Sequence, residues 1–235
     1  MPSVGAKEIY QARVLTERDR KILIFTGQGG IATLTQLHQK FWEQAKERTA
    51  YERLGELVRA GYLGSQTVHI RKSGERVYTL TPKGVRQFSV PEREGLMVGL
   101  PAHHELKQQL IAQDIRLLVE KEFEQRGMKL LEWQNERQLR SEQRHQLEQA
   151  KRARGWGKVI AGAVEDIPDA RVMIVNAEGE TGELDIEIDG QYSKQMLVDK
   201  ISSFARTARP TLWVTSPGRL ERIRDEVEKA RAGKI

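Results

Sequence analysis

The apolar residues in the first part of the chain recur at steps of three and four, which is the spacing of amphipathic helices. The clearest case is the stretch 45–63, whose packing positions are Ala50, Leu54, Leu57 and Val58. Basic residues occupy the other faces of this stretch. Gly61 ends the pattern, because glycine adopts the left-handed conformation of a helix C-terminus without steric cost. The pattern therefore predicts a helix over about residues 46 to 60 that buries one face and presents a basic one.

Two helices are predicted before this one and a β-hairpin after it. Thr16 and Thr33 stand directly before apolar-periodic segments, where a threonine hydroxyl can accept a hydrogen bond from an exposed helix amide. Alternating residues over 67–71 and 76–80 predict two strands around the turn 72–75. Three helices followed by a basic hairpin are typical of a winged helix-turn-helix, whose third helix enters the major groove of DNA.

The winged-helix interpretation assigns candidate DNA contacts to both the third helix and the hairpin. The residues expected nearest the bases are Lys46, Arg48, Tyr51 and Glu52. We expect Arg71, Lys72 and Arg76 to contact phosphates, because a wing lies against the DNA backbone or in the minor groove. Winged-helix proteins often bind two half-sites as dimers, so a homodimer paired through a long helix at 103–126 is also expected.

The second half of the chain is predicted to alternate between helices and strands. Beyond the long helix, the predicted strands are 129–133, 171–175, 182–189 and 211–215, and the predicted helices are 194–206 and 217–231. Residues 138–154 are rich in Gln and Arg and have almost no apolar positions. The segment can therefore be interpreted either as an exposed helix or as a mobile excursion of the chain. We therefore predict an α+β protein with a winged helix over residues 1–90, a linker over 91–101 and an α/β domain over 102–235.

Positive charge is concentrated in the first of these parts. Residues 1–90 hold 15 Lys and Arg against 8 Asp and Glu, whereas residues 91–235 hold 24 against 25. The formal net charge of +6 therefore comes entirely from the N-terminal part. Such a local excess is expected of a face that binds DNA phosphates through counterion release, and a solvated basic surface is the alternative.

Composition and hydropathy limit the classes of chemistry and location. The chain has no cysteine, which excludes disulfides and thiolate chemistry. It has no apolar run of about 18 residues that could cross a bilayer, and its first residues lack the apolar centre of a signal peptide. We therefore expect a cytoplasmic protein with no membrane partner.

Acidic residues alternate along the predicted strand 182–189. Alternate residues of a strand point to the same face, so one face of this strand carries four acids, Glu183, Asp185, Glu187 and Asp189. Together with Asp169, which precedes the neighbouring strand, Glu187 could hold a magnesium ion that activates water for phosphodiester hydrolysis. An acidic solvent-facing surface or an inactive remnant is the alternative interpretation.

Taken together, these segments resemble the replication-relaxation family of plasmid and mobile-element proteins. The segments that carry the resemblance are LTERDRKIL (15–23), RTAYERLGELVRAGYL (48–63), YTLTPKG (78–84), the histidine pair at 103 and 104, EWQNERQLR (132–140), IPDA (167–170) and IEIDG (186–190), with Lys200 downstream. The resemblance implies a winged helix joined to a domain similar to the PD-(D/E)xK, or restriction-endonuclease-like, fold.

The same resemblance implies roles for particular residues of the second domain. Asp169 and Glu187 would be catalytic and would bind Mg²⁺, and Lys200 would be the catalytic lysine supplied from a helix. The nuclease pattern has a lysine two residues after the strand acid, where this chain has Asp189. An aspartate there adds repulsion toward a phosphate, so we expect a degenerate nuclease-like domain and no certain cofactor, with Mg²⁺ bound only if the site is active.

The leading hypothesis is a DNA-binding protein of plasmid or mobile-element replication or relaxation. Its expected partners are double-stranded DNA and other replication or transfer proteins. A magnesium-dependent nuclease and a winged-helix transcriptional repressor are the alternatives.

Overall fold

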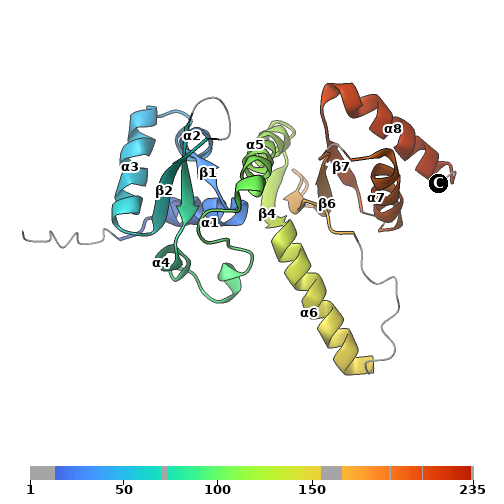
Figure 1. Ribbon diagram of the computed structural model, residues 1–235, viewed down its shortest axis with the longest axis horizontal. Coiled ribbons are helices and arrows are strands. Elements are labelled where there is room, and N and C mark those ends of the chain that lie inside the picture. The colour runs from blue at the N-terminus through green and yellow to red at the C-terminus, as the bar shows by residue number, and fades with distance from the viewer. Residues whose placement is uncertain (1–13, 70–73, 155–165, 191, 208, 234–235) are drawn as a thin grey trace, which may run out of the picture. The chain divides into compact units, whose positions relative to one another are not determined.

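The computed structural model describes residues 14–69, 74–154, 166–190, 192–207 and 209–233. It contains helices and two separate sheets, which confirms a mixed α and β protein (Figure 1). The chain divides into two compact units, Met1–Leu117 and Leu118–Ile235. Among the described residues, no helix is both long enough and apolar enough to span a membrane.

The first unit contains the helices and the hairpin predicted from the N-terminal pattern. Its elements are α1 (Glu17–Gly29), β1 (Ala32–Thr33), α2 (Leu34–Trp42), α3 (Glu47–Arg59), β2 (Leu63–Val68), β3 (Glu75–Leu80), α4 (Pro82–Val85), the 3-10 helix η1 (Pro91–Arg93) and the first part of α5 (His103–Gln125). The strands form an antiparallel sheet in the order β1-β3-β2. The short strand β1 was not predicted, because two residues are too few to show an alternating pattern.

The two threonines that were predicted to begin helices do so through reciprocal caps. The Thr16 hydroxyl accepts the backbone N–H of Asp19 at 3.2 Å, and the Asp19 carboxylate accepts the backbone N–H of Thr16 at 2.8 Å. Thr33 and Gln36 form the same arrangement at the start of α2. Each cap satisfies amides that the helix itself leaves unpaired, so the local sequence fixes where α1 and α2 begin.

One apolar core joins the three helices to the sheet. Its fully buried members include Ile22, Leu23, Leu37, Leu54 and Leu80, each with an exposed fraction of 0%. The apolar face predicted for α3 lies in this core, which leaves the opposite face of the helix outside it.

The hairpin begins directly after α3. Strand β2 starts at Leu63, ahead of the alternating segment 67–71, and Leu63 pairs with Leu80 and is buried with it. The turn residues 70–73, including Arg71 and Lys72, lie outside the described residues.

The segment 91–101, predicted as a linker, is packed against the first unit. The backbone N–H of Met97 donates to the carbonyl of Gly27 at 2.8 Å, and that of Gly99 donates to Leu80 at 2.9 Å. Leu106 and Leu110 of α5 are buried with residues of the sheet. The division between the two units therefore lies within α5, because the first turns of that helix complete the core of the first unit.

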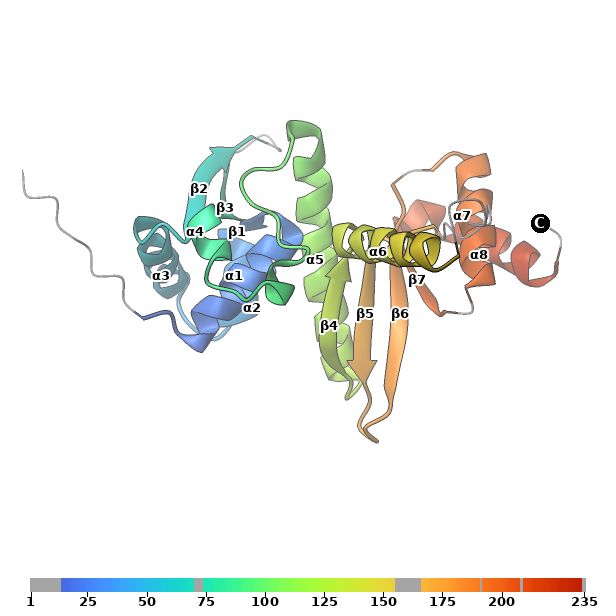
Figure 2. The same ribbon diagram turned by 90° about the horizontal axis from the view of Figure 1, so that it is seen from below.

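The second unit is built on a four-stranded sheet with the order β4-β5-β6-β7 (Figure 2). After the end of α5, its elements are β4 (Lys129–Asn135), α6 (Glu136–Arg154), β5 (Ala170–Val175), β6 (Thr181–Ile188), α7 (Lys194–Arg206), β7 (Thr211–Val214) and α8 (Pro217–Arg231). Neighbouring strands are antiparallel except β6 and β7, which are parallel and joined through α7. The Gln- and Arg-rich residues 138–154 are helical, so the exposed-helix interpretation of this segment is the right one.

Candidate functional site

The four residues predicted to lie nearest DNA bases are on the outer side of α3. Lys46 stands at its N-cap, and Arg48, Tyr51 and Glu52 follow on the exposed face. The Arg48 side chain is 85% exposed, although its Nε donates to Glu52 Oε1 at 2.7 Å. This i,i+4 ion pair lies in solvent, where such pairs contribute little to stability, so a ligand can replace it at low cost.

Arg76 connects the hairpin to α3. Its Nη1 donates to the Tyr51 hydroxyl at 2.8 Å, and its guanidinium lies 5.5 Å from the centroid of the Tyr51 ring. Sequence reasoning placed Arg76 on phosphates and Tyr51 on bases as separate contacts. The structure holds the two side chains together, so a change in either one alters the other.

A buried ion pair that sequence reasoning missed holds α3 against α1. Arg53 Nε donates to Asp19 Oδ1 at 2.9 Å. Its two terminal nitrogens donate to Asp19 (Nη2) and to Glu56 (Nη1). Burial by itself would raise the pKa of Asp19, but the hydrogen bonds from Arg53 and Thr16 together lower it below its usual value. The ionised Asp19 side chain, only 1% exposed, therefore ties the cap of α1 to the middle of α3.

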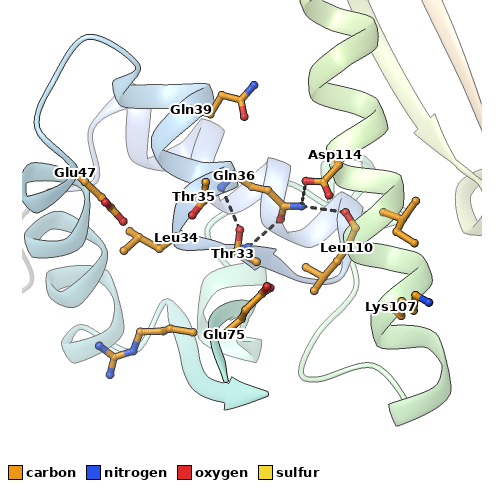
Figure 3. Close-up of a pocket in the computed structure, with 12 residues that line it drawn as sticks. Thr33, Leu34, Thr35, Gln36, Gln39, Glu47, Glu75, Lys107, Leu110 and Asp114 are labelled. Atoms are coloured by element: carbon orange, nitrogen blue, oxygen red, sulfur yellow. Dashed lines mark hydrogen bonds between the residues drawn. The ribbon is translucent and has the colours of Figure 1, made fainter. Parts of the chain in front are cut away.

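A cavity of about 400 Å³ lies beside α2 and the first part of α5. Figure 3 shows Gln36 at its wall, where its amide nitrogen donates to Asp114 Oδ1 at 2.7 Å and to the Leu110 carbonyl at 3.0 Å. The Gln36 amide oxygen accepts the backbone N–H of Thr33 at 2.9 Å. The amide is thus saturated by protein groups, and its role is to join α2 to α5.

In the second unit, the fold brings together Asp169, Glu187 and Lys200. Lys200 Nζ forms an ion pair with Glu187 Oε1, and the Tyr192 hydroxyl donates to the same oxygen at 2.7 Å. Asp169 Oδ2 accepts the backbone N–H of Ile188 at 2.8 Å, which places it beside the end of β6. The β6-α7 connection explains the geometry, because it returns Lys200 to the strand that carries Glu187.

The Glu187 carboxyl is the most strongly perturbed acid of this site. Its side chain is 0% exposed, and its second oxygen, Oε2, is buried with no hydrogen-bond partner among the described residues. Burial first, and then the charge of Asp169, raises the pKa of Glu187 to about 7 against the opposing effect of Lys200. Burial likewise raises the pKa of Asp169. Perturbed carboxyls held next to a lysine are typical of functional sites, although structural networks also produce them.

Of the four acids predicted to share one face of β6, Glu183 is exposed, whereas the side chains of Asp185, Glu187 and Asp189 are buried. Asp185 accepts from Arg171 Nε at 2.6 Å and from Arg209 at 3.3 Å, and it is 1% exposed. Asp189 accepts from Arg219 Nη2 at 3.0 Å and from the Thr215 hydroxyl at 2.8 Å.

Asp189 stands where the nuclease pattern has a lysine, and the repulsion expected from it is offset by Arg219. Sequence reasoning could not find Arg219, because it comes from α8, 30 residues further along the chain. The arginine holds the pKa of Asp189 below its usual value despite burial, so the pair stays ionised and mutually compensated.

Asp169 and Glu187 are the candidate ligands for a magnesium ion in the second unit. Among the described residues, no group of three or more His, Cys, Asp or Glu side chains could hold a metal. Asp169 and Glu187 supply two carboxylates, and Mg²⁺ is often bound by one or two carboxylates together with water and substrate phosphates. The unpartnered Glu187 Oε2 is therefore compatible with an ion that also binds a substrate phosphate.

Comparison with known proteins identifies one family. A family model described as replication-relaxation matches residues 26–220 of the chain. Comparison with curated proteins and with solved structures gave no match.

Proposed function

Because the chain belongs to the replication-relaxation family, which implies a role in plasmid or mobile-element replication or relaxation, we propose that it binds double-stranded DNA. A winged helix within residues 1–90 makes the contact, with α3 in the major groove and the β2-β3 hairpin on the backbone. Pairing of two copies through α5 stays a prediction.

The observation that supports this proposal is the exposed face of α3. Arg48, Tyr51 and Glu52 project from it, while the opposite face is anchored in the core. The Arg53–Asp19 pair fixes the helix from one side, and the Arg76–Tyr51 contact links it to the hairpin. A rigidly held helix with exposed polar side chains can read base edges, because hydrogen-bond readout requires fixed geometry.

We expect Arg48→Ala to change which DNA sequence the protein prefers. An arginine that donates two hydrogen bonds to a guanine contributes about 1–3 kcal/mol of discrimination against other bases. Selection of bound duplexes from a random pool, followed by titration of the selected sequence and a scrambled one, measures this difference. Lys21→Ala, an exposed residue of α1, is the matched control for loss of one positive charge. An Arg48 variant with unchanged preference would contradict the assignment of α3 to the bases.

A second candidate function, Mg²⁺-dependent DNA cleavage, is favoured by the unpartnered oxygen of Glu187 beside Asp169. These two carboxylates would hold the ion, which would supply an activated water for phosphodiester hydrolysis. Lys200 would bring positive charge to the phosphate, since its ammonium already lies at the carboxylates. Tyr192 orients Glu187 through its hydroxyl.

Cleavage is tested with supercoiled plasmid and Mg²⁺ or Mn²⁺. The nuclease proposal predicts nicking by the native protein that both Asp169→Ala and Glu187→Ala abolish. Glu183→Ala is the matched control, because Glu183 is an exposed acid on the same strand. Plasmid that stays supercoiled with the native protein removes this candidate and leaves the DNA-binding proposal unaffected.

A further inference from the structure

Helix α6 carries a local excess of positive charge in a part of the chain that otherwise has none. Residues 136–154 hold six basic side chains against three glutamates, whereas residues 91–235 as a whole hold 24 against 25. The basic residues of α6 are Arg137, Arg140, Arg144, Lys151, Arg152 and Arg154. This excess belongs to neither the α3 face nor the carboxylate site.

The spacing of four of these six residues places them on one side of the helix, which they share with Glu148. Arg137, Arg140 and Arg144 are three and four residues apart, so they lie above one another on one face, and Arg152 follows two turns later near that face. The arginines at these four positions are exposed. The opposite side faces the strands of its own unit, where Leu139 and Gln143 line a hollow with Arg171 of β5.

The side chains of α6 that the structure describes form no apolar face for a partner. Among the side chains of α6 that the structure describes, Leu139 alone is buried and no large apolar side chain is exposed. Docking into a hydrophobic groove or insertion into a membrane surface both need an apolar face. Figure 1 shows the far half of α6 extending beyond the strands of its sheet. A polar helix with so little packing is supported chiefly by local pairs such as Glu136–Arg140.

We propose that α6 is a second DNA contact, which binds the phosphate backbone without reading sequence. The distance along the helix from Arg137 to Arg152 is about 22 Å at 1.5 Å per residue. That length corresponds to roughly six phosphates of one strand, at about 3.4 Å per phosphate along the DNA axis. The contact goes beyond the proposed winged helix, since α6 belongs to the other compact unit.

The test is the salt dependence of binding to random-sequence duplex DNA by the full chain. We expect the double variant Arg144→Gln, Arg152→Gln to lower the slope of log affinity against log salt concentration by about 1.8, at about 0.9 per lost phosphate contact. Glutamine has a helix propensity close to that of arginine, so the helix is retained, and circular dichroism checks this. The matched control is Arg224→Gln, Arg231→Gln, which removes two exposed arginines from α8.

The outcomes separate this inference from the proposed function. A reduced slope for the α6 variant with a native slope for the α8 variant supports the α6 contact. Equal slopes for the native protein and the α6 variant overturn it, and a changed sequence preference of Arg48→Ala in the selection experiment would then leave the α3 proposal standing. Equal reductions in both double variants would also overturn it, because they would reflect net charge and not a contact of α6. Absence of salt-dependent binding by the native protein removes both proposals.

Discussion

Asp19→Ala is expected to lower the free energy of unfolding by about 3 kcal/mol, the low end for breaking a buried ion pair. The variant removes the reciprocal cap of α1 and leaves Arg53, whose side chain is only 21% exposed, with Glu56 as its remaining acidic partner. Urea denaturation followed by circular dichroism measures the change. Because α3 is held through Arg53, we also expect weaker sequence-specific DNA binding under conditions where the variant is folded.

Two comparisons make this prediction specific to the Asp19–Arg53 pair. Glu17→Ala changes an exposed acid of the same helical turn and is expected to cost less than about 0.5 kcal/mol. In a double-mutant cycle, Asp19→Ala combined with Arg53→Ala should cost clearly less than the sum of the two single changes. Additive losses would show that the two side chains act independently and that the ion pair does not hold α3.

The native protein is expected to lose free energy of unfolding as pH rises from about 4.5 to about 7. In the Glu187→Gln variant this loss should be absent. In the folded protein the Glu187 carboxyl has a pKa of about 7, whereas the ordinary value of 4.5 applies to the unfolded chain. Between these values the folded state holds a proton that the unfolded state has released, so stability falls as pH rises through this interval. The shift corresponds to about 3 kcal/mol, at about 1.4 kcal/mol per pKa unit.

The measurement is the free energy of unfolding at several pH values for the native protein and the variant. Their difference should change by about the expected amount as pH rises from about 4.5 through 7, and it should become constant about one unit above the folded-state pKa. Glu183→Gln, on the same strand but exposed, should run parallel to the native protein. The lowered pKa of Asp19 and of Asp189 acts at more acidic pH, where stability falls as pH decreases, so these groups stay outside the interval. Parallel curves for Glu187→Gln would show that Glu187 titrates normally.

The family resemblance named some residues of the candidate site in the second unit and did not name others. The resemblance named Asp169, Glu187 and Lys200, and the fold brings them together. It did not include Tyr192, whose hydroxyl orients Glu187, and nothing in the order of residues showed that Glu187 is completely buried. Burial depends on α7 and on the neighbouring strands, and it is burial that sets the proton affinity of Glu187.

The sequence by itself determined the features that depend on residues within about four positions of each other. The caps at Thr16 and Thr33 and the amphipathic face of α3 follow from such short-range relations. The tertiary structure decided which distant charges meet. Asp19 and Arg53 are 34 residues apart, and Asp189 and Arg219 are 30 apart. Only the packing of whole elements brings such groups together. The same packing removes them from water, so each pair is a buried ion pair that connects two elements and not two separate surface charges.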